Sequence, residues 1–289
     1  MAGFTTRDLS EAFGVEITDL DLGAPLDDDT QQALRELFDD RGLLVFPDVD
    51  IAHATQAAIS MMLIRREHEL LETGEDRNPI TDTWYISNKR EKAAAPFGRL
   101  QFHADGMWAD EPFEMVSLYG AEVEEPSVPT IFVSTVVGAS TLPEELRARV
   151  DGLHALHTMA EIRRGDTTDV LVSKVADVRT TVKPVLYTHP RTGQQLLYIC
   201  EQMTQEIVEL DPEPSERLLE ELFDHLYAPE ARLEHQWHKG DFVVWDNLSV
   251  QHARGKVDAD GPARTLRKVA HPVPRLDQAE QPVFSAAVD

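Results

Sequence analysis

The sequence contains little cysteine, few basic residues and no long hydrophobic run. Cys200 is the only cysteine among the 289 residues, which excludes an internal disulfide framework and favours a reducing, cytoplasmic location. The longest apolar stretch, residues 57–64, is interrupted by Ser60 and is far too short to cross a bilayer. The first residues lack the basic start and apolar run of a signal peptide. The sequence therefore predicts a cytoplasmic protein that does not associate with membranes.

Acidic residues outnumber basic ones along the whole chain. There are 52 aspartates and glutamates against 27 lysines and arginines, which gives a formal net charge of −25. Such a charge opposes binding to nucleic acids and to anionic membrane surfaces. Because the acidic residues are spread rather than gathered into a tail, they are typical of a well-solvated surface. A small anionic substrate would therefore need a local basic pocket.

The strand and helix patterns bound the fold class. Glycine and proline are scattered and no repeat is present, so residues 1–289 are expected to form a single domain. Short strand patterns dominate from Leu100 onward, as in residues 113–123 and 130–137, with a few flanking helices. This pattern predicts a mixed α+β, β-rich fold built on a sandwich or barrel. Residues 73–99 are polar and irregular, and we expect a lid or insert there, close to the functional site.

Two histidines and an aspartate form the most informative pattern. His103 and Asp105 are two residues apart, so on an extended strand they point to the same side. His252 has to come from a second strand folded back over the first. Two imidazoles and one carboxylate can occupy one face of a metal ion and leave the opposite positions open, which suits a non-haem Fe(II) that binds a co-substrate and O₂. A lone His-x-Asp is common by chance, so its weight depends on the surrounding residues.

The surrounding segments resemble the taurine dioxygenase (TauD/TfdA) family of Fe(II)- and 2-oxoglutarate-dependent dioxygenases. The resemblance extends from residue 17 to residue 264 and is most specific in Trp245–His252 and Arg264–Lys268. It implies a double-stranded β-helix, the jelly roll shared with cupins, with helices packed outside. It also implies that His103, Asp105 and His252 are the catalytic iron ligands.

The same resemblance assigns residues to the co-substrate. Arg264, 12 residues after His252, matches the arginine that pairs with the distal carboxylate of 2-oxoglutarate. Thr130 matches the threonine that hydrogen-bonds this carboxylate. A planar guanidinium can bind a carboxylate through two parallel hydrogen bonds, which supports the role. On a strand Arg264 and Lys268 share one face while Arg267 points away, so Arg264 is the better candidate of the two arginines.

Three positions bear on how closely the chain follows the family. Val128-Pro129 stands where the family usually has glycines and an aspartate, and Lys268 stands where a second arginine is common. Lysine offers a point charge rather than a fork, so a sulfonate held as in taurine dioxygenase is not expected. Asp105 is not a small residue, which removes the halide-binding vacancy of halogenating relatives. Hydroxylation is therefore favoured over halogenation.

The resemblance implies a reaction but not a substrate. Oxidative decarboxylation of 2-oxoglutarate would be coupled to hydroxylation, or a related oxidation, of a C–H bond in a small organic molecule. Lys268 and Arg99, four residues before His103, are candidates to contact an anionic substrate, although a solvated surface charge explains each equally well. The cofactors implied are Fe(II), 2-oxoglutarate and O₂. Relatives that form dimers or tetramers make a homo-oligomer one of the expected states.

Two other readings remain open from the residues alone. A cupin-like metal dioxygenase or lyase that does not use 2-oxoglutarate typically has more histidine ligands, and it gives Arg264 and Thr130 no role. A non-catalytic jelly-roll binding module would carry a vestigial metal site. The intact triad of His103, Asp105 and His252 counts against that reading.

Overall fold

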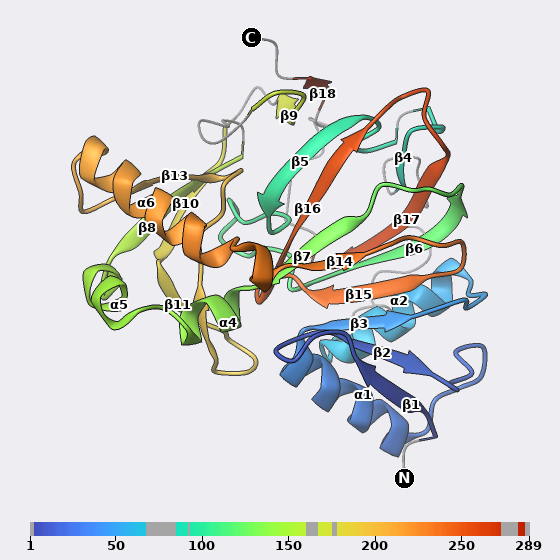
Figure 1. Cartoon of the computed structure of the whole chain (residues 1–289). Helices are drawn as coiled ribbons and strands as arrows, with labels where there is room; N and C mark the ends of the chain where they lie inside the picture. Colours follow the sequence, from blue (N-terminus) through green and yellow to red (C-terminus); the bar gives the residue numbers. More distant parts are fainter. Residues whose placement is uncertain are drawn as a thin grey trace.

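The computed structural model describes residues 3–67, 85–91, 93–159, 167–174, 178–272 and 283–286. Within these ranges strands predominate and helices lie around them, so the expected mixed, β-rich architecture is confirmed (Figure 1). No helix of the described part is both long and apolar enough to cross a membrane.

The larger sheet has seven strands in the order β1-β2-β3-β15-β6-β17-β4. Its strands are β1 (Thr5–Asp8), β2 (Val15–Thr18), β3 (Leu43–Phe46), β4 (Tyr85–Ser87), β6 (Met115–Val123), β15 (Phe242–Asp246) and β17 (Arg264–His271). All neighbours are antiparallel except β2 and β3, which run parallel. The order brings the C-terminal strands β15 and β17 to either side of β6, so residues distant in sequence share one face.

The smaller sheet has four antiparallel strands in the order β14-β7-β16-β5. These are β14 (Leu233–His235), β7 (Thr130–Ser134), β16 (Val250–Val257) and β5 (Gly98–His103). It packs face to face with the larger sheet, since the rings of Phe132 on β7 and Trp245 on β15 lie 5.3 Å apart, edge to face. Buried side chains from both sheets form one hydrophobic cluster in this layer. The space between the two sheets is where the candidate site lies.

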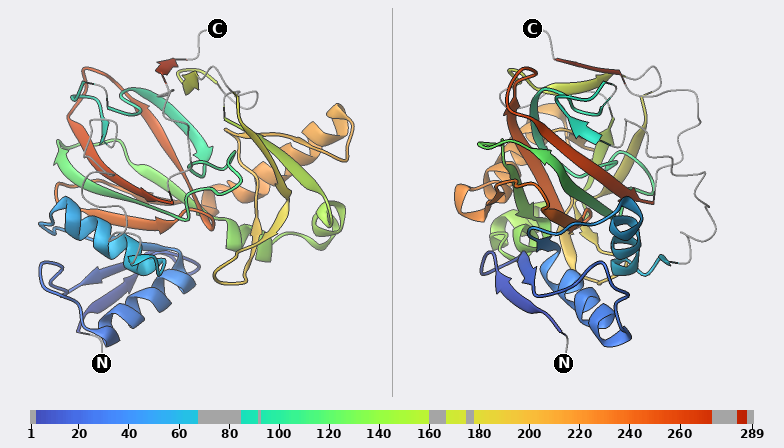
Figure 2. Two further views of the ribbon diagram at one scale, coloured as in Figure 1. Left: turned by 180° about the vertical axis from the view of Figure 1, so that it is seen from behind. Right: turned by 90° about the vertical axis from the view of Figure 1, so that its right-hand side faces the viewer.

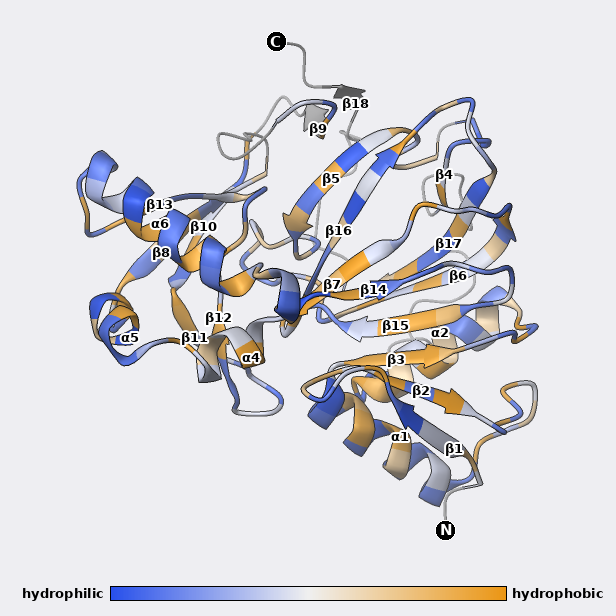
Figure 3. Cartoon of the chain, in the orientation of Figure 1, coloured by the Kyte–Doolittle hydropathy of each residue, from blue (hydrophilic) through white to orange (hydrophobic). Residues whose placement is uncertain are grey.

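Two helices cover the outer face of the larger sheet, α1 (Asp28–Arg41) and α2 (His53–Leu63) (Figures 1 and 2). Helix α1 begins where the Asp27 carboxylate accepts a hydrogen bond from Thr30 N and ends at Gly42, whose φ of 67° favours glycine. Strand β3 and helix α2 consist largely of hydrophobic residues (Figure 3), and both contribute to the buried cluster between helices and sheet. This packing covers the outer face of the larger sheet, so the opposite face of β17 is turned towards the smaller sheet.

The remaining elements lie beside the smaller sheet, most of them in one lobe (Figure 2). They are α4 (Thr135–Ser140), α5 (Glu144–Val150), β8 (His154–Thr158), β9 (Leu171–Lys174), β10 (Thr180–Pro184), β11 (Leu186–Thr188), β12 (Gln195–Leu197), β13 (Thr204–Ile207), α6 (Pro212–Leu226), a 3-10 helix (Pro229–Ala231) and β18 (Val283–Ala286). Helix α6 packs its apolar face against this lobe and β7. The lobe reaches the site through Met159, Gln202 and Met203.

Candidate metal centre and anion pocket

The structure brings the two histidines and the aspartate of the motif together. Each of His103, Asp105 and His252 offers one ligand atom, and these atoms all lie within 4.8 Å of one another. Among the described residues this is the one group of three or more such side chains. Both imidazoles are buried, and their ring centroids are 4.2 Å apart. The donors are two nitrogens and one carboxylate oxygen, the set that suits Fe(II) with open positions opposite the protein.

Strand pairing and one asparagine place the three side chains. His252 on β16 lies directly opposite His103 on β5. Strand β5 ends at His103, so Asp105 lies in the following turn and not on the extended strand that the sequence analysis assumed. Asn247 holds this turn: its Oδ1 accepts from Asp105 N and its Nδ2 donates to Asp105 O, both at 2.9 Å. The asparagine of the Trp245–His252 segment therefore positions a candidate ligand through the backbone.

Protonation states favour metal binding. The Nδ1 of His103 lies 2.7 Å from Gln101 O; because a carbonyl only accepts, Nδ1 carries the proton and Nε2 faces Asp105 Oδ1 at 3.5 Å. Burial, reinforced by nearby positive groups, holds the pKa of His252 well below its usual range, so this ring is neutral. For Asp105, burial raises the pKa, but the opposing effects, of which the Lys268 ammonium is the largest, keep the pKa well below the usual range. A neutral imidazole and an ionised carboxylate are the forms that ligate metals.

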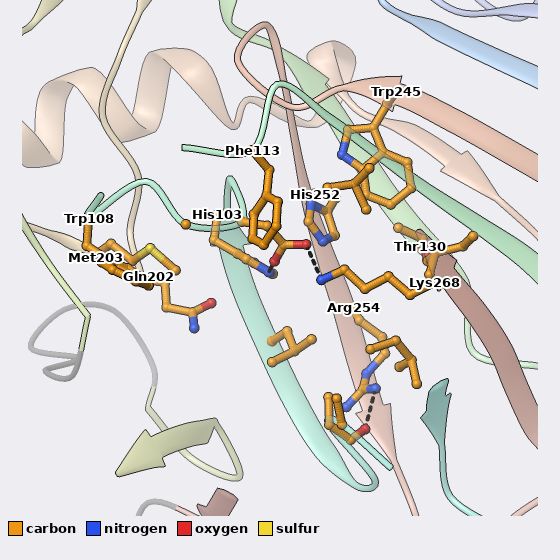
Figure 4. A pocket seen from close by; sticks show the side chains of 18 of the residues that line it. His103, Trp108, Phe113, Thr130, Gln202, Met203, Trp245, His252, Arg254 and Lys268 are labelled. Atoms are coloured by element: carbon orange, nitrogen blue, oxygen red, sulfur yellow. Dashed lines mark hydrogen bonds and ion pairs between the residues drawn. The ribbon is translucent and has the colours of Figure 1, made fainter. Parts of the chain in front are cut away.

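The triad lies at one end of a cavity of about 270 Å³ between the sheets. Figure 4 shows His103, His252 and Lys268 directed towards one another, while the side chain of Arg254 on β16 extends away from them towards backbone carbonyls. Lys268 Nζ lies 2.6 Å from Asp105 Oδ2 and 5.6 Å from the centre of the Phe113 ring. Much of the remaining lining is apolar, including Leu100, Trp108, Val116, Met159 and Met203. A mostly apolar pocket with a few polar groups is the usual form of a small-molecule site.

Arg264 and Thr130 line the same cavity and contact each other. Arg264 Nη2 donates to Thr130 Oγ1 at 3.2 Å, and Trp237 Nε1 donates to the same oxygen at 2.9 Å. Because the hydroxyl accepts both of these hydrogen bonds, its own proton remains available to a further acceptor. Arg264 Nε donates to Val128 O at 3.1 Å, a backbone contact that does not depend on the side chains at Val128-Pro129.

The charge on Arg264 is buried without an anion. Its side chain is 4% exposed, and no carboxylate of the described residues lies within 4 Å of its guanidinium. Burial, and then the positive charge of Arg254, lower the pKa of Arg264, but a guanidinium remains charged in proteins. A buried charge is costly unless it is paired. The guanidinium and the Thr130 hydroxyl are therefore suited to receive a carboxylate from a ligand.

Trp237 contacts the candidate site through Thr130, and the sequence analysis missed it because no motif or spacing marks it. We expect Trp237→Phe, which keeps an aromatic ring but removes the hydrogen bond to Thr130, to raise the Kd of a carboxylate ligand in this pocket roughly three- to tenfold. Titration of the metal-loaded protein with 2-oxoglutarate measures this. An unchanged Kd would show that Trp237 does not orient the Thr130 hydroxyl for ligand binding.

Not every predicted residue reaches the cavity. Lys268 and Arg264 line it, whereas Arg267 donates to Gln56 Oε1 and Ile51 O on the other side of the sheet, as alternation along β17 predicts. Arg99 is not among the lining residues.

A bulge in β5 accounts for the position of Arg99. Opposite the step from His252 to Arg254, β5 advances from His103 to Leu100, so it contains one extra residue there. Leu100, rather than Arg99, consequently shares the face of His103, and both line the cavity. A spacing of four residues would have placed Arg99 on that face only in a regular strand.

The segment predicted as a lid is described only in part. Ile86, Ala94 and Ala95 line the cavity, so the later portion of residues 73–99 borders the site. Residues 73–84 and 92 lie outside the described residues.

The chain is similar to known proteins over most of its length. Residues 5–270 match the family described as taurine catabolism dioxygenase TauD, TfdA family. The (S)-phenoxypropionate/alpha-ketoglutarate-dioxygenase of Sphingobium herbicidovorans is 28% identical over 261 residues, which cover 86% of this chain and 88% of that protein. The pentalenolactone F synthase of Streptomyces avermitilis is 26% identical over 291 residues, which cover 91% and 92%.

Solved structures show the same fold. A taurine dioxygenase from Burkholderia xenovorans aligns with a TM-score of 0.73 at 24% identity, covering 98% of this chain and 96% of that one. At this identity the likeness concerns the arrangement of strands and helices, not the choice of substrate.

Proposed function

Because this chain belongs to the TauD, TfdA family of dioxygenases, we propose that it hydroxylates, or otherwise oxidises, a C–H bond of a small anionic organic molecule. The resemblance identified from the sequence is confirmed, and the chain is an Fe(II)- and 2-oxoglutarate-dependent oxidoreductase. Family membership implies Fe(II), 2-oxoglutarate and O₂ as cofactor and co-substrates. We further propose that the two facing sheets form the double-stranded β-helix core of the family.

One observation supports the roles that we assign to the metal-binding and co-substrate-binding residues. A single cavity holds the metal-ligand triad at one end and, elsewhere in its lining, a buried arginine and threonine without an acidic partner in the described part of the chain. A metal enzyme that did not use a dicarboxylic keto acid would leave Arg264 as an uncompensated buried charge. The pairing of these two features therefore favours 2-oxoglutarate over the cupin-like alternative.

Each residue then has a distinct part in the reaction. His103, Asp105 and His252 would hold Fe(II), which, once bound, supplies the O₂-dependent oxidation coupled to decarboxylation of the keto acid. Arg264 and Thr130 would bind the distal carboxylate and fix the orientation of the co-substrate. Asn247 fixes the turn that carries Asp105. Apolar lining residues would exclude water from the reacting C–H bond.

The position of Lys268 is evidence for an anionic substrate. It is the cation nearest the triad in the cavity, and it lies close to the Phe113 ring. Trp108 adds a second aromatic ring to the lining of the same cavity. One relative is named for phenoxypropionate, an aryl carboxylic acid, whereas another is named as a pentalenolactone F synthase, so the substrate cannot be carried over directly. We propose a carboxylic acid with an apolar body, whose carboxylate would contact Lys268.

Succinate release tests this proposal. The parent protein, loaded with Fe(II), is given 2-oxoglutarate and a panel of aryl and alicyclic carboxylic acids, each paired with its neutral amide. We expect stimulation by acids in preference to amides, and loss of that preference by about tenfold or more in Lys268→Met, since a hydrogen bond to a charged group is removed.

Lys268 contacts a candidate ligand, so the Fe(II) affinity of the variant is measured in parallel, and Lys268→Arg serves as the charge-conserving control. Equal stimulation by acids and amides in the parent would contradict an anionic substrate. Failure of the parent to decarboxylate 2-oxoglutarate with any compound, together with no 2-oxoglutarate binding, would contradict the activity itself.

A further inference from the structure

A second buried arginine lines the cavity and has no role in the scheme above. Arg254 lies two residues after His252 on β16, and its side chain is 4% exposed. In the strand register it stands directly opposite Thr130 on β7. Two residues of a strand advance the chain by about 7 Å, so Arg254 is displaced from the metal ligand towards the Thr130 end of the cavity.

The hydrogen bonds of Arg254 leave part of its guanidinium unused. Nη1 donates to Ala95 O, and Nη2 donates to Phe97 O and Gly98 O, each at 2.9 Å. Nε is buried and meets no hydrogen-bond partner among the described residues. No described carboxylate lies within 4 Å of this guanidinium either, so backbone carbonyls alone surround the charge.

Arg254 also adds to the charge around Arg264. After burial, the positive charge of Arg254 is the second cause that lowers the pKa of Arg264, so the two guanidiniums repel each other. Two buried guanidiniums that repel each other destabilise an empty pocket unless an anion occupies it. Since both arginines line the same cavity, a carboxylate bound there would be attracted by both cations.

We propose that Arg254 is a second co-substrate-binding cation, whose Nε–H and positive charge act with Arg264 and Thr130 on the distal carboxylate of 2-oxoglutarate. This inference rests on the proposed function and goes beyond it, since neither motif nor spacing singles out Arg254. Through its carbonyl contacts the same side chain links occupancy of the carboxylate site to residues 95–98, which lead into β5.

A purely structural role is the competing explanation. Arg254 could serve only to fasten residues 95–98 to β16, and its loss would then alter the site without regard to the ligand's charge. The two explanations differ for a keto acid that lacks the distal carboxylate. 2-Oxopentanoate is such a compound, because it has a methyl group where 2-oxoglutarate has the second carboxylate.

The test is anaerobic titration of the Fe(II)-loaded protein with each keto acid, following the visible metal-to-ligand charge-transfer band. We expect Arg254→Gln to raise the Kd of 2-oxoglutarate roughly tenfold or more while the Kd of 2-oxopentanoate changes little. Arg254→Lys, which restores charge without the Nε geometry, should recover part of the difference. Arg41→Gln is a matched control, because Arg41 also donates to backbone carbonyls (Ser10, Glu11 and Gly14) but lies far from the cavity.

Equal changes for both keto acids, or no change for either, would overturn the inference in favour of a structural role. If Arg254→Gln does not fold, the ratio of the two Kd values in Arg254→Lys decides: an unchanged ratio overturns the proposal. A parent protein that gives no band with 2-oxoglutarate contradicts the proposed function instead, so the two failures are distinguishable.

Discussion

Replacement of Asp105 by alanine is expected to abolish Fe(II) binding and, with it, succinate formation from 2-oxoglutarate. Asp105 is the one carboxylate of the triad, and its depressed pKa keeps it ionised at neutral pH. Its removal leaves two imidazoles as the remaining ligands and frees the Lys268 ammonium, which then repels a metal cation. The loss should exceed the roughly 10- to 100-fold that removal of an outer-shell partner costs in metal affinity.

Competition with a chromophoric Fe(II) chelator measures this affinity directly, and thermal unfolding of the metal-free variant shows whether the fold persists. Asp110→Ala removes a nearby carboxylate that hydrogen-bonds Thr181 rather than facing the triad. It should bind Fe(II) almost as the parent does. Retention of parental Fe(II) affinity by Asp105→Ala would remove Asp105 from the metal site.

The sequence predicted much of the site because its signals are local or periodic. His103 and Asp105 are neighbours, so a short motif reveals them. Arg264 and Lys268 are separated by an even number of residues on one strand, so alternation alone places both in the cavity. Residues whose positions follow from two-residue periodicity could be assigned before any strand was paired.

What the sequence could not predict depends on contacts between distant segments. Arg254 joins the site because β16 pairs with β7, and Trp237 because β14, which it follows, pairs with β7 as well. No pattern in the chain encodes these pairings. Arg99 was placed near the site on regular spacing, but the bulge in β5 reverses its face. Asp105 was expected on a strand, whereas a turn held by Asn247 carries it.

The fold, like the site, was predictable where the signals are local and not where they depend on contacts between distant segments. Repeated short strand patterns from Leu100 onward indicated the β-rich class. The parallel pairing of β2 with β3 and the insertion of β15 between β3 and β6 were not indicated, since strand order depends on long-range contacts. The side chains that line the cavity come from both sheets, so the order of strands, more than their existence, determines the site.

Arg264→Met is expected to weaken 2-oxoglutarate binding selectively. The variant keeps an apolar side chain of similar length but removes the buried cation that, in our proposal, pairs with the distal carboxylate. Truncating one partner of a buried hydrogen-bonded charge pair costs about 2–5 kcal/mol. At about 1.4 kcal/mol per factor of ten, the Kd should rise roughly 30-fold or more. The anaerobic charge-transfer titration reports this Kd without requiring turnover.

The proposed pairing of Arg264 with the distal carboxylate predicts the outcome of three further comparisons. Binding of 2-oxopentanoate should be unaffected or tighter in Arg264→Met, because its terminal methyl group no longer meets a desolvated cation. Arg264→Lys should recover only part of the affinity, since lysine supplies charge without the two-point geometry. Arg267→Met, on the same strand but directed to Gln56 and Ile51, should leave both Kd values unchanged. An equal loss of affinity for both keto acids in Arg264→Met would mean that Arg264 shapes the pocket without binding the carboxylate.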